Sequence, residues 1–264
     1  MTNKTDYLNI NRKSWDARTL VHVHSKFYGM NEVLDGKSTL NDIELQLLGN
    51  LKGKSILHLQ CHFGLDSISL ARLGAQVTGV DFSQKAIEQA LELNKKTGQN
   101  ANFIFSDVYE LNLAERFDFI FTTYGVIGWL PDMDRWAKII SKHLKPGGKL
   151  IFVEFHPIVW MFDNKFKYIA YNYSKAEEII EDEKGTYADR NAELNLTTVT
   201  WNHSLSEVIG SLIKAGLEIK HFEEYDYSPY NCFEETVEFE KGKFRIKHLD
   251  NKIPMIYSLV AEMK

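Results

Sequence analysis

Short apolar runs alternate with helical patterns over the first two thirds of the chain. Residues 55–60, 76–80 and 117–123 are near-continuous apolar runs, which are typical of parallel strands buried on both faces. Between the first two runs, the apolar residues of 65–73 recur at helical spacing, and Gly74 follows as a helix stop. This order of strand, helix and strand predicts a parallel α/β sheet with helices on its faces.

The remaining elements follow from the same periodicities and from polar caps and glycine stops. Helices are predicted over 6–24, 41–48, 84–97, 133–144 and 205–215, and strands over 102–106, 149–155, 217–225 and 254–263. A hairpin is predicted over 236–246 around Lys241-Gly242, and a two-residue turn there would pair Phe239 with Phe244 and Glu238 with Arg245.

Residues 157–202 interrupt this pattern. Aromatic-rich pieces with β propensity, 167–173 and 196–201, alternate there with the acidic run 175–183. We interpret the segment as an inserted, β-rich arm, and residues 1–52 as a helical cap that precedes the first strand. With no internal repeat or linker in sight, a single domain accounts for the whole chain.

Asp81 and the first turn define a candidate ligand. Asp81 ends the second strand about 20 residues after that turn, which is where a parallel sheet holds a ribose. A dinucleotide site needs G-x-G-x-x-G in the turn so that the backbone approaches a pyrophosphate, but Gln60 and His62 stand at the first two positions and only Gly64 remains. The ligand expected here is adenosine without phosphate.

Several ordered landmarks resemble the class I S-adenosylmethionine-dependent methyltransferases. They are the stretch 55–83, Phe105-Ser106-Asp107-Val108, the run 117–121 and Leu144-Lys145-Pro146-Gly147-Gly148; His58 replaces the acid of the first motif. The resemblance implies a Rossmann-like, seven-stranded, mostly parallel sheet of order 3-2-1-4-5-7-6 with an antiparallel seventh strand. It also implies S-adenosylmethionine as the methyl donor and an arm that covers the active site.

The resemblance further implies roles for individual residues. Asp81 would bind the ribose, Asp107 the adenine amino group, and the backbone of Val108 the adenine ring. A solvated loop is the alternative for Asp107, and packing anchors are the alternative for Trp15 and Tyr28. The full set of expected donor contacts is Trp15, Tyr28, Gln60, Cys61, His62, Gly64, Asp81, Phe82, Ser83, Asp107, Val108, Thr123 and Tyr124.

Three residues are candidates for the acceptor side. Tyr124 follows the fourth strand, His156 follows the fifth, and His203 follows the inserted arm. Tyr124 would line the methyl-transfer path, and either histidine could orient or deprotonate the acceptor, although a structural histidine is the alternative for each. No metal site is expected from His58, Cys61 and His62, because no four-ligand pattern accompanies them.

Composition narrows the function. A formal net charge of -5 offers no basic excess for nucleic acid, and hydrophobic and charged contents of 44% and 25% are ordinary for a globular protein. Two cysteines and a polar segment at 1–10, which lacks the apolar stretch of a signal peptide, favour the cytoplasm. We expect a small-molecule methyltransferase, monomeric or homodimeric. The alternatives are a non-catalytic donor-binding partner subunit and a nicotinamide-dependent oxidoreductase.

Overall fold

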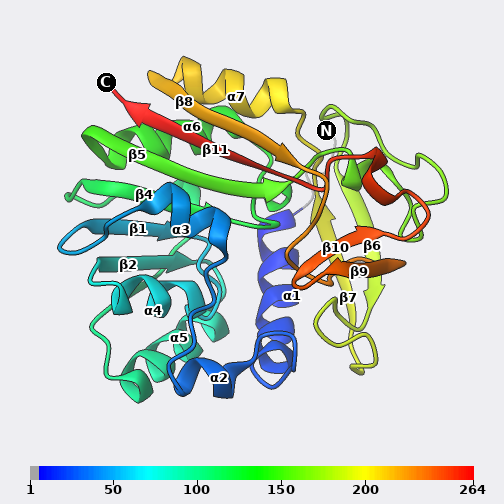
Figure 1. The fold of residues 1–264 in the computed structure, drawn as a ribbon, viewed down its shortest axis with the longest axis horizontal. Helices are drawn as coiled ribbons and strands as arrows, with labels where there is room; N and C mark the ends of the chain where they lie inside the picture. The colour runs from blue at the N-terminus through cyan, green and yellow to red at the C-terminus, as the bar shows by residue number, and fades with distance from the viewer. Residues whose placement is uncertain (1–5) are drawn as a thin grey trace.

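The centre of the protein is a seven-stranded sheet, seen in a computed structural model that describes residues 6–264 (Figure 1). Its order is β3-β2-β1-β4-β5-β11-β8, and β11 runs antiparallel to both of its neighbours. The strands are β1 (Ser55–Leu59), β2 (Gln76–Asp81), β3 (Asn102–Phe105), β4 (Phe117–Thr123), β5 (Leu144–Phe155), β8 (Leu217–Tyr225) and β11 (Ile256–Met263). Because β8 and β11 are the sixth and seventh strands of this sheet along the chain, the predicted order 3-2-1-4-5-7-6 is confirmed.

Seven α-helices accompany the sheet in the described part of the chain. They are α1 (Tyr7–His22), α2 (Met30–Leu34), α3 (Asp42–Leu48), α4 (Leu65–Arg72), α5 (Gln84–Thr97), α6 (Met133–His143) and α7 (Leu205–Lys214). The side chains of Ser83, Asp132 and Ser204 each accept a hydrogen bond from the backbone N–H three residues later, as N-caps do. None of the helices within residues 6–264 is long and apolar enough to cross a membrane.

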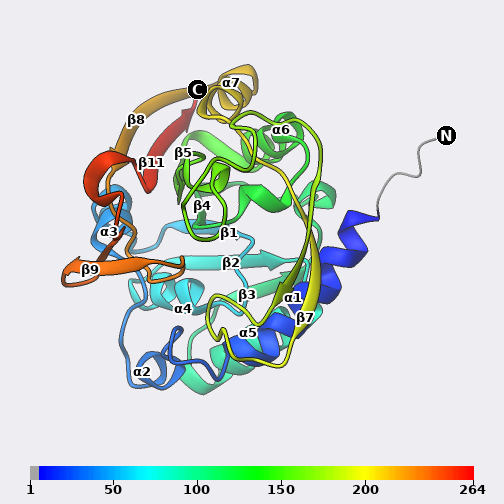
Figure 2. The ribbon, with the colours of Figure 1, turned by 90° about the vertical axis from the view of Figure 1, so that its right-hand side faces the viewer.

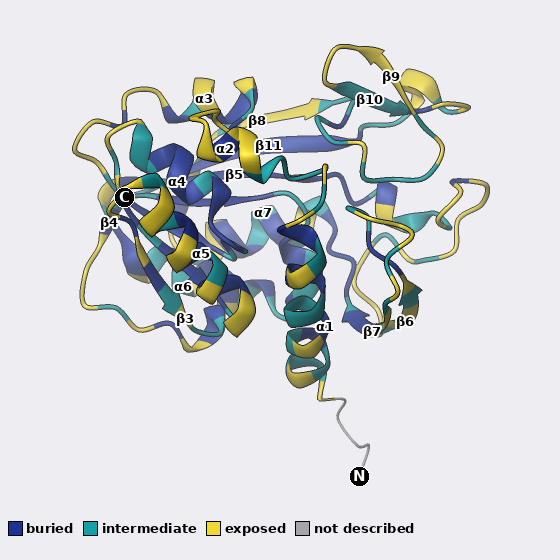
Figure 3. Cartoon of the chain, turned by 90° about the horizontal axis from the view of Figure 1, so that it is seen from below, coloured by how far each residue is buried: buried dark blue, intermediate teal, exposed yellow. Residues whose placement is uncertain are grey.

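Alternate residues of the central strands serve two separate cores. Leu57 and Phe152 are fully buried in a cluster with Trp136 of α6, whereas Ile56 and Ile151, one position earlier on the same strands, belong to a cluster with α4 and α5. This alternation follows from the two-residue period of a strand. Figure 3 shows the result, a buried sheet between helices whose outer faces are exposed.

Helix α1 stands across the carboxyl ends of the parallel strands, and the inserted arm lies on its far side (Figures 1 and 2). The arm is an antiparallel pair, β6 (Ile179–Lys184) and β7 (Asn195–Thr200). Asn11 Nδ2 donates to Val199 O at 2.7 Å, and Val199 N donates to Asn11 Oδ1 at 2.9 Å. Arg18 Nη2 also pairs with Glu183 Oε2 at 2.7 Å. The arm therefore holds α1 against the sheet.

The arm differs from its prediction. Residues 167–173 form no strand and supply only an isolated bridge between Phe162 and Ile169, whereas β6 overlaps the acidic run 175–183. The reason is that the charges of β6 alternate: Glu181 and Glu183 face inward and accept hydrogen bonds from Tyr171 and Arg18, while their neighbours face water. Acidic residues are compatible with a strand when the inward ones have partners.

The fifth strand and the cap also depart from expectation. β5 begins at Leu144 and runs through Pro146-Gly147-Gly148, so α6 ends before this segment rather than in it. Helix α2 was not predicted. Asn41 occupies the N-cap of α3 as expected, but its side chain donates to Glu44 Oε1 rather than accepting from the backbone. Residues 1–5 of the predicted cap and of the polar N-terminal segment lie outside the described residues.

The last hairpin forms with a different register. It consists of β9 (Thr236–Glu240) and β10 (Lys243–Ile246), and a bulge after Lys243 pairs Phe244 with Glu238 and Arg245 with Val237. The shift allows Arg245 to stack over Phe239 at 3.7 Å and to bond Asp226. The predicted pairs of Phe239 with Phe244 and of Glu238 with Arg245 were therefore wrong, because the bulge after Lys243 shifts the register by one residue.

Candidate active site

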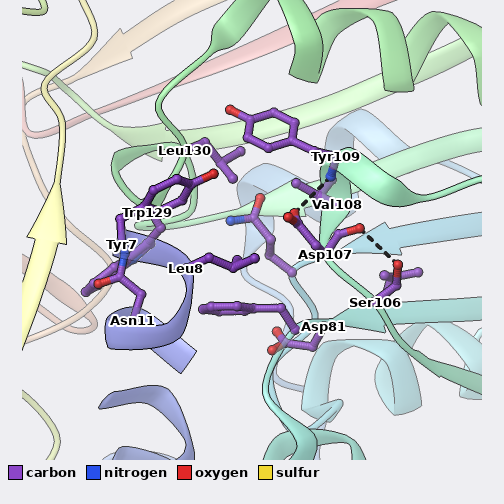
Figure 4. A pocket seen from close by; sticks show the side chains of 13 residues that line it. Tyr7, Leu8, Asn11, Asp81, Ser106, Asp107, Val108, Tyr109, Trp129 and Leu130 are labelled. Carbon is purple, nitrogen blue, oxygen red and sulfur yellow. Dashed lines mark hydrogen bonds between the residues drawn. The ribbon is translucent and has the colours of Figure 1, made fainter. Parts of the chain in front are cut away.

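A pocket opens where β1, β2 and β3 end, beneath α1 (Figure 4). Parallel register brings these ends together, since Leu59 pairs with Val80 and Asp81 with Phe105. The residues that line the pocket are Tyr7, Leu8, Asn11, Gln60, Val80, Asp81, Phe82, Ser106, Asp107, Val108, Tyr109, Trp129 and Leu130. Asp81 and Asp107 lie on one side of the pocket, and Leu8 and Asn11 of α1 lie on the other (Figure 4).

Asp81 is buried and fixed by the backbone. Its Oδ2 accepts from His62 N and its Oδ1 from Ser83 N, both at 2.8 Å. Burial, opposed by these hydrogen bonds, raises the pKa of Asp81 to about 6. Because each carboxylate oxygen has two lone pairs, one on each oxygen remains for hydroxyl groups of a ligand. The side chain is thus oriented before any ligand arrives.

Asp107 follows β3 and begins a short 3-10 helix, Val108–Glu110. Its Oδ1 accepts from Tyr109 N at 3.0 Å, and partial burial raises its pKa. Ser106 Oγ donates to the carbonyl of Asp107, so the loop is held from both sides. The Asp107 carboxylate and the backbone of the buried Val108 thus line the pocket next to each other.

The turn after β1 has the backbone conformation of a glycine-rich loop, although other residues occupy the first two glycine positions. Gln60 and His62 have φ values of 54° and 49°, in the left-handed region that glycine normally occupies. Gly64 is needed, because its φ is 83° and a Cβ there would lie 2.8 Å from the Phe103 ring. Gln60 Nε2 donates to Val126 O at 2.8 Å, while its buried Oε1 has no partner among the described residues.

A buried glutamate that the sequence reasoning missed organises the neighbouring loop. Glu154 of β5 accepts from the backbone N–H groups of Gly125, Val126 (2.8 Å), Ile127 (3.2 Å) and Phe155 (2.7 Å). It thereby fixes the loop after β4, which contributes Trp129 and Leu130 to the pocket. The sequence signal for it was one acidic residue inside the otherwise apolar run 150–155.

Rings from several segments meet beside the pocket in an arc that we call the aromatic belt. The belt comprises Trp15, His22, Phe27, Tyr28, His62, Tyr124, Tyr187 and Tyr230, with neighbouring ring centroids 4.9–6.4 Å apart. Trp15 joins it to the pocket, because its ring lies 5.2 Å from that of Trp129. The structure thus brings together Trp15, Tyr28, His62 and Tyr124. His22 was missed, although it shares a helix face with Trp15 and Arg18.

The other predicted donor contacts surround the pocket to different degrees. Phe82 lines it directly, whereas Ser83 caps α5 and donates to Asp16 Oδ1 at 2.6 Å. The buried Cys61 directs its thiol to the carbonyl of His62 at 3.6 Å, and Thr123 is buried at the end of β4. His58 bonds Ser67 Oγ at 2.8 Å and is thereby turned away from His62.

His156 and His203 lie outside the lining of the pocket and contact other protein groups. His156 Nδ1 accepts from Ile158 N at 3.2 Å, and its Nε2 lies 2.8 Å from Glu224 Oε1. His203 contacts Glu207 through Nδ1 at 3.0 Å and Leu130 O through Nε2 at 2.8 Å. Both ring nitrogens of each histidine therefore have protein neighbours, and neither side chain lines the pocket. These contacts favour the structural alternative given for each histidine, and the catalytic role suggested for them stays a prediction.

Comparisons with known proteins agree with this geometry. Residues 56–148 match the protein family described as a methyltransferase domain. A ubiquinone biosynthesis O-methyltransferase of Coxiella burnetii is 40% identical over 114 residues, which cover 43% of this chain and 47% of that protein. An uncharacterized protein of Haemophilus influenzae is 29% identical over 209 residues, 74% of this chain and 77% of that one. The chain thus spans about half the length of the Coxiella relative.

Solved structures share the fold at low identity. An S-adenosylmethionine-dependent methyltransferase from Mesorhizobium loti has a TM-score of 0.58 at 21% identity, over 87% of this chain and 99% of that one. Magnesium protoporphyrin IX methyltransferase from Synechocystis, solved with bound S-adenosylmethionine, has a TM-score of 0.55 at 14% identity over 100% of both chains. The strand order and these solved structures show that the chain has the fold of the S-adenosylmethionine-dependent methyltransferases, and residues 56–148 match a methyltransferase domain within it.

Proposed function

We propose that the protein transfers the methyl group of S-adenosylmethionine to an oxygen atom of a small-molecule acceptor. The observation that carries the proposal is Asp81, a buried carboxylate that the backbone orients at the end of β2 and that keeps lone pairs for two hydroxyl groups. The oxygen acceptor is suggested by the name of the Coxiella burnetii relative, an O-methyltransferase.

The residues of the pocket fit such a donor. Asp81 would hold the ribose, while Asp107 and the backbone of Val108 would hold the adenine, with Phe82 against the ring. The unpartnered Gln60 Oε1 would accept from the ammonium group of the methionine end. Side chains at positions 60 and 62 leave little room for a pyrophosphate, which disfavours a nicotinamide dinucleotide. When bound, the donor supplies a methyl group on a positively charged sulfur, which is already a good leaving group.

The acceptor would lie beside the aromatic belt. Tyr124 follows β4 at this position, and its ring packs 4.9 Å from that of Tyr230. Its hydroxyl is buried beside Glu44 and Asn41, so a ligand that reached it would meet all three polar groups. The protein would then act mainly by aligning acceptor and methyl group, and orientation of this kind supplies roughly 7–11 kcal/mol in favourable cases.

We further infer that the cap, residues 1–52, and the arm, residues 157–202, form one domain with the sheet and close the site over its ligands. The support is the pair of hydrogen bonds between Asn11 and Val199, which ties cap to arm above the pocket. A cytoplasmic enzyme, monomeric or homodimeric, that does not bind nucleic acid remains our expectation from composition.

Two measurements test the proposal. Titration calorimetry should show binding of S-adenosylmethionine and S-adenosylhomocysteine but not of NAD. Incubation with methyl-labelled donor and a low-molecular-weight cell extract should then label at least one small molecule. Binding of NAD in preference to S-adenosylmethionine would contradict the proposed donor. Binding of S-adenosylmethionine without any labelled product would indicate a non-catalytic donor-binding subunit instead.

A further inference from the structure

Two histidines from distant segments form a pair beside the pocket. His22 closes α1 and His62 lies in the turn after β1, and His22 Nδ1 is 3.0 Å from His62 Nε2. The other nitrogen of each ring, His22 Nε2 and His62 Nδ1, is buried and has no hydrogen-bond partner within residues 6–264. Leaving a buried polar atom without a partner costs about 1–3 kcal/mol. Two such atoms on one pair indicate that a polar ligand completes them.

The pair has a fixed hydrogen-bonding character whichever ring carries the shared proton. If His22 donates, then His62 must hold its own proton on Nδ1, and His22 Nε2 keeps a lone pair. If His62 donates, the two outer atoms exchange these roles. A neutral pair therefore always presents one N–H donor and one unprotonated nitrogen to its surroundings.

The neighbouring groups keep both rings neutral. Burial first, and the charge of Arg18 second, lower the pKa of His22 to about 3; burial, the charge of His22 and that of Arg18 lower the pKa of His62 well below its ordinary value. Arg18 is itself paired with Glu183 of β6. The remaining titratable neighbours are Tyr28 and Tyr187, whose hydroxyls bond each other and whose pKa values burial raises. Nothing in this set competes with the pair for a proton at neutral pH.

We propose that His22 and His62 act together as the base that takes the proton from an acceptor hydroxyl group, an assignment that rests on the proposed methyl transfer. The C–O bond forms as the C–S bond breaks, and the electron pair of that bond stays on sulfur. The hydroxyl proton passes to the unprotonated outer nitrogen of the pair. The shared proton then crosses the 3.0 Å contact to the other ring, and that ring releases the proton of its own outer nitrogen, so the pair returns to neutrality with its two roles exchanged.

The surroundings also indicate the class of acceptor. Around the pair stand the rings of Trp15, Tyr28 and Tyr187, with Trp15 5.1 Å from His62 and Tyr187 4.9 Å from His22. Such walls favour a flat, largely apolar molecule, because aromatic groups stack or meet edge to face at these distances. A hydroxyl group on that molecule would supply the polar partner that the pair lacks.

Three variants test the role. His22→Asn keeps a polar atom near the Nδ1 position, so it retains the contact with His62 but removes Nε2. His62→Gly removes the ring and suits the left-handed φ of 49° at this position. The matched control is His24→Asn, an exposed histidine two residues from His22. Each variant is assayed for S-adenosylhomocysteine affinity, melting temperature and transfer of labelled methyl groups to the cell-extract pool, between pH 6 and pH 10.

We expect His22→Asn and His62→Gly to lose about 10²–10⁴-fold in transfer rate at pH 7, as loss of a general base typically does. In His22→Asn, whose residue is not among the expected donor contacts, S-adenosylhomocysteine affinity should stay within about threefold of wild type. The rates of both variants should recover as pH rises, because an ionised acceptor needs no base. The control should match wild type. Wild-type transfer rates in both variants would overturn the proposal, as would a loss that is independent of pH or, in His22→Asn, accompanied by lost affinity. If the wild-type protein itself labels nothing, the proposed function fails instead.

Discussion

Replacing Asp81 by Asn tests the donor site most directly. The carboxylate accepts two backbone hydrogen bonds at 2.8 Å, from His62 and Ser83, and would accept two more from ribose hydroxyls. Asn keeps one oxygen acceptor and loses the charge. Hydrogen bonds to a charged group contribute about 1.5–3 kcal/mol, so we expect donor affinity to fall about 10–150-fold.

The same change also affects stability, because the amide of Asn cannot accept from both backbone N–H groups. One buried N–H left without a partner costs about 1–3 kcal/mol, and each kcal/mol lowers the melting temperature of a domain of this size by about 2–4 °C. Calorimetry with S-adenosylhomocysteine and a thermal melt separate the two effects. Glu88→Gln, an exposed charge on α5, is the control. Affinity within threefold of wild type would remove the ribose assignment.

The pKa of Asp81 adds a pH dependence to this test. Burial raises the pKa from 3.8 to about 6, so the folded protein binds this proton more tightly than the unfolded chain does. The contribution of Asp81 to stability is therefore present below pH 3.8 and is lost as pH rises through 6. Donor affinity should move in the opposite direction and weaken as pH falls through 6, since only the ionised carboxylate accepts both hydroxyls. Affinity in the Asn variant should lack this dependence.

Two further predictions concern the loops that shape the pocket. Glu154→Gln removes the charge that accepts four backbone N–H groups, so we expect a loss of about 2–4 kcal/mol in urea unfolding, and an unchanged midpoint would contradict its role. Gly64→Ala should destabilise the protein by about 2 kcal/mol or more, because the new Cβ would meet the Phe103 ring at 2.8 Å, whereas Gly98→Ala, with φ of 64° and open space, should cost only about 1 kcal/mol. Equal losses in both alanine variants would show that backbone strain alone matters at Gly64.

Local signals predicted most of the sheet and its helices. Ser83, Asp132 and Ser204 correctly predicted three helix starts, because an N-cap contact joins residues only three positions apart. β6 could not be predicted in the same way. Its inward glutamates are compatible with a strand only because partners such as Arg18, 165 residues away, satisfy them. A short stretch of sequence around β6 gives no indication of a partner so far away along the chain.

The residues of the candidate site also fall into those that local patterns predict and those that depend on distant contacts. Asp81 and Asp107 follow strands whose patterns are visible in the sequence, so their convergence at one edge of the sheet was predictable. The contact between His22 and His62 spans 40 residues, and it depends on how α1 crosses the strand ends. His156 and His203 also follow elements on this edge, but the partners that occupy their nitrogens come from β8, α7 and the loop after β4.

The hydrogen bonds between Asn11 of α1 and Val199 of the arm have a consequence for folding during translation. Asn11 and Val199 are 188 residues apart, and at roughly 5–20 residues per second the helix waits about 10–40 s for its partner strand to be translated. During that time the face of α1 that carries Trp15 and His22 has no arm to cover it. We therefore expect the five parallel strands, β1 to β5, to form before α1 docks, so that a ribosome-bound chain stalled before residue 195 would expose this helix to a protease that spares it in the finished protein.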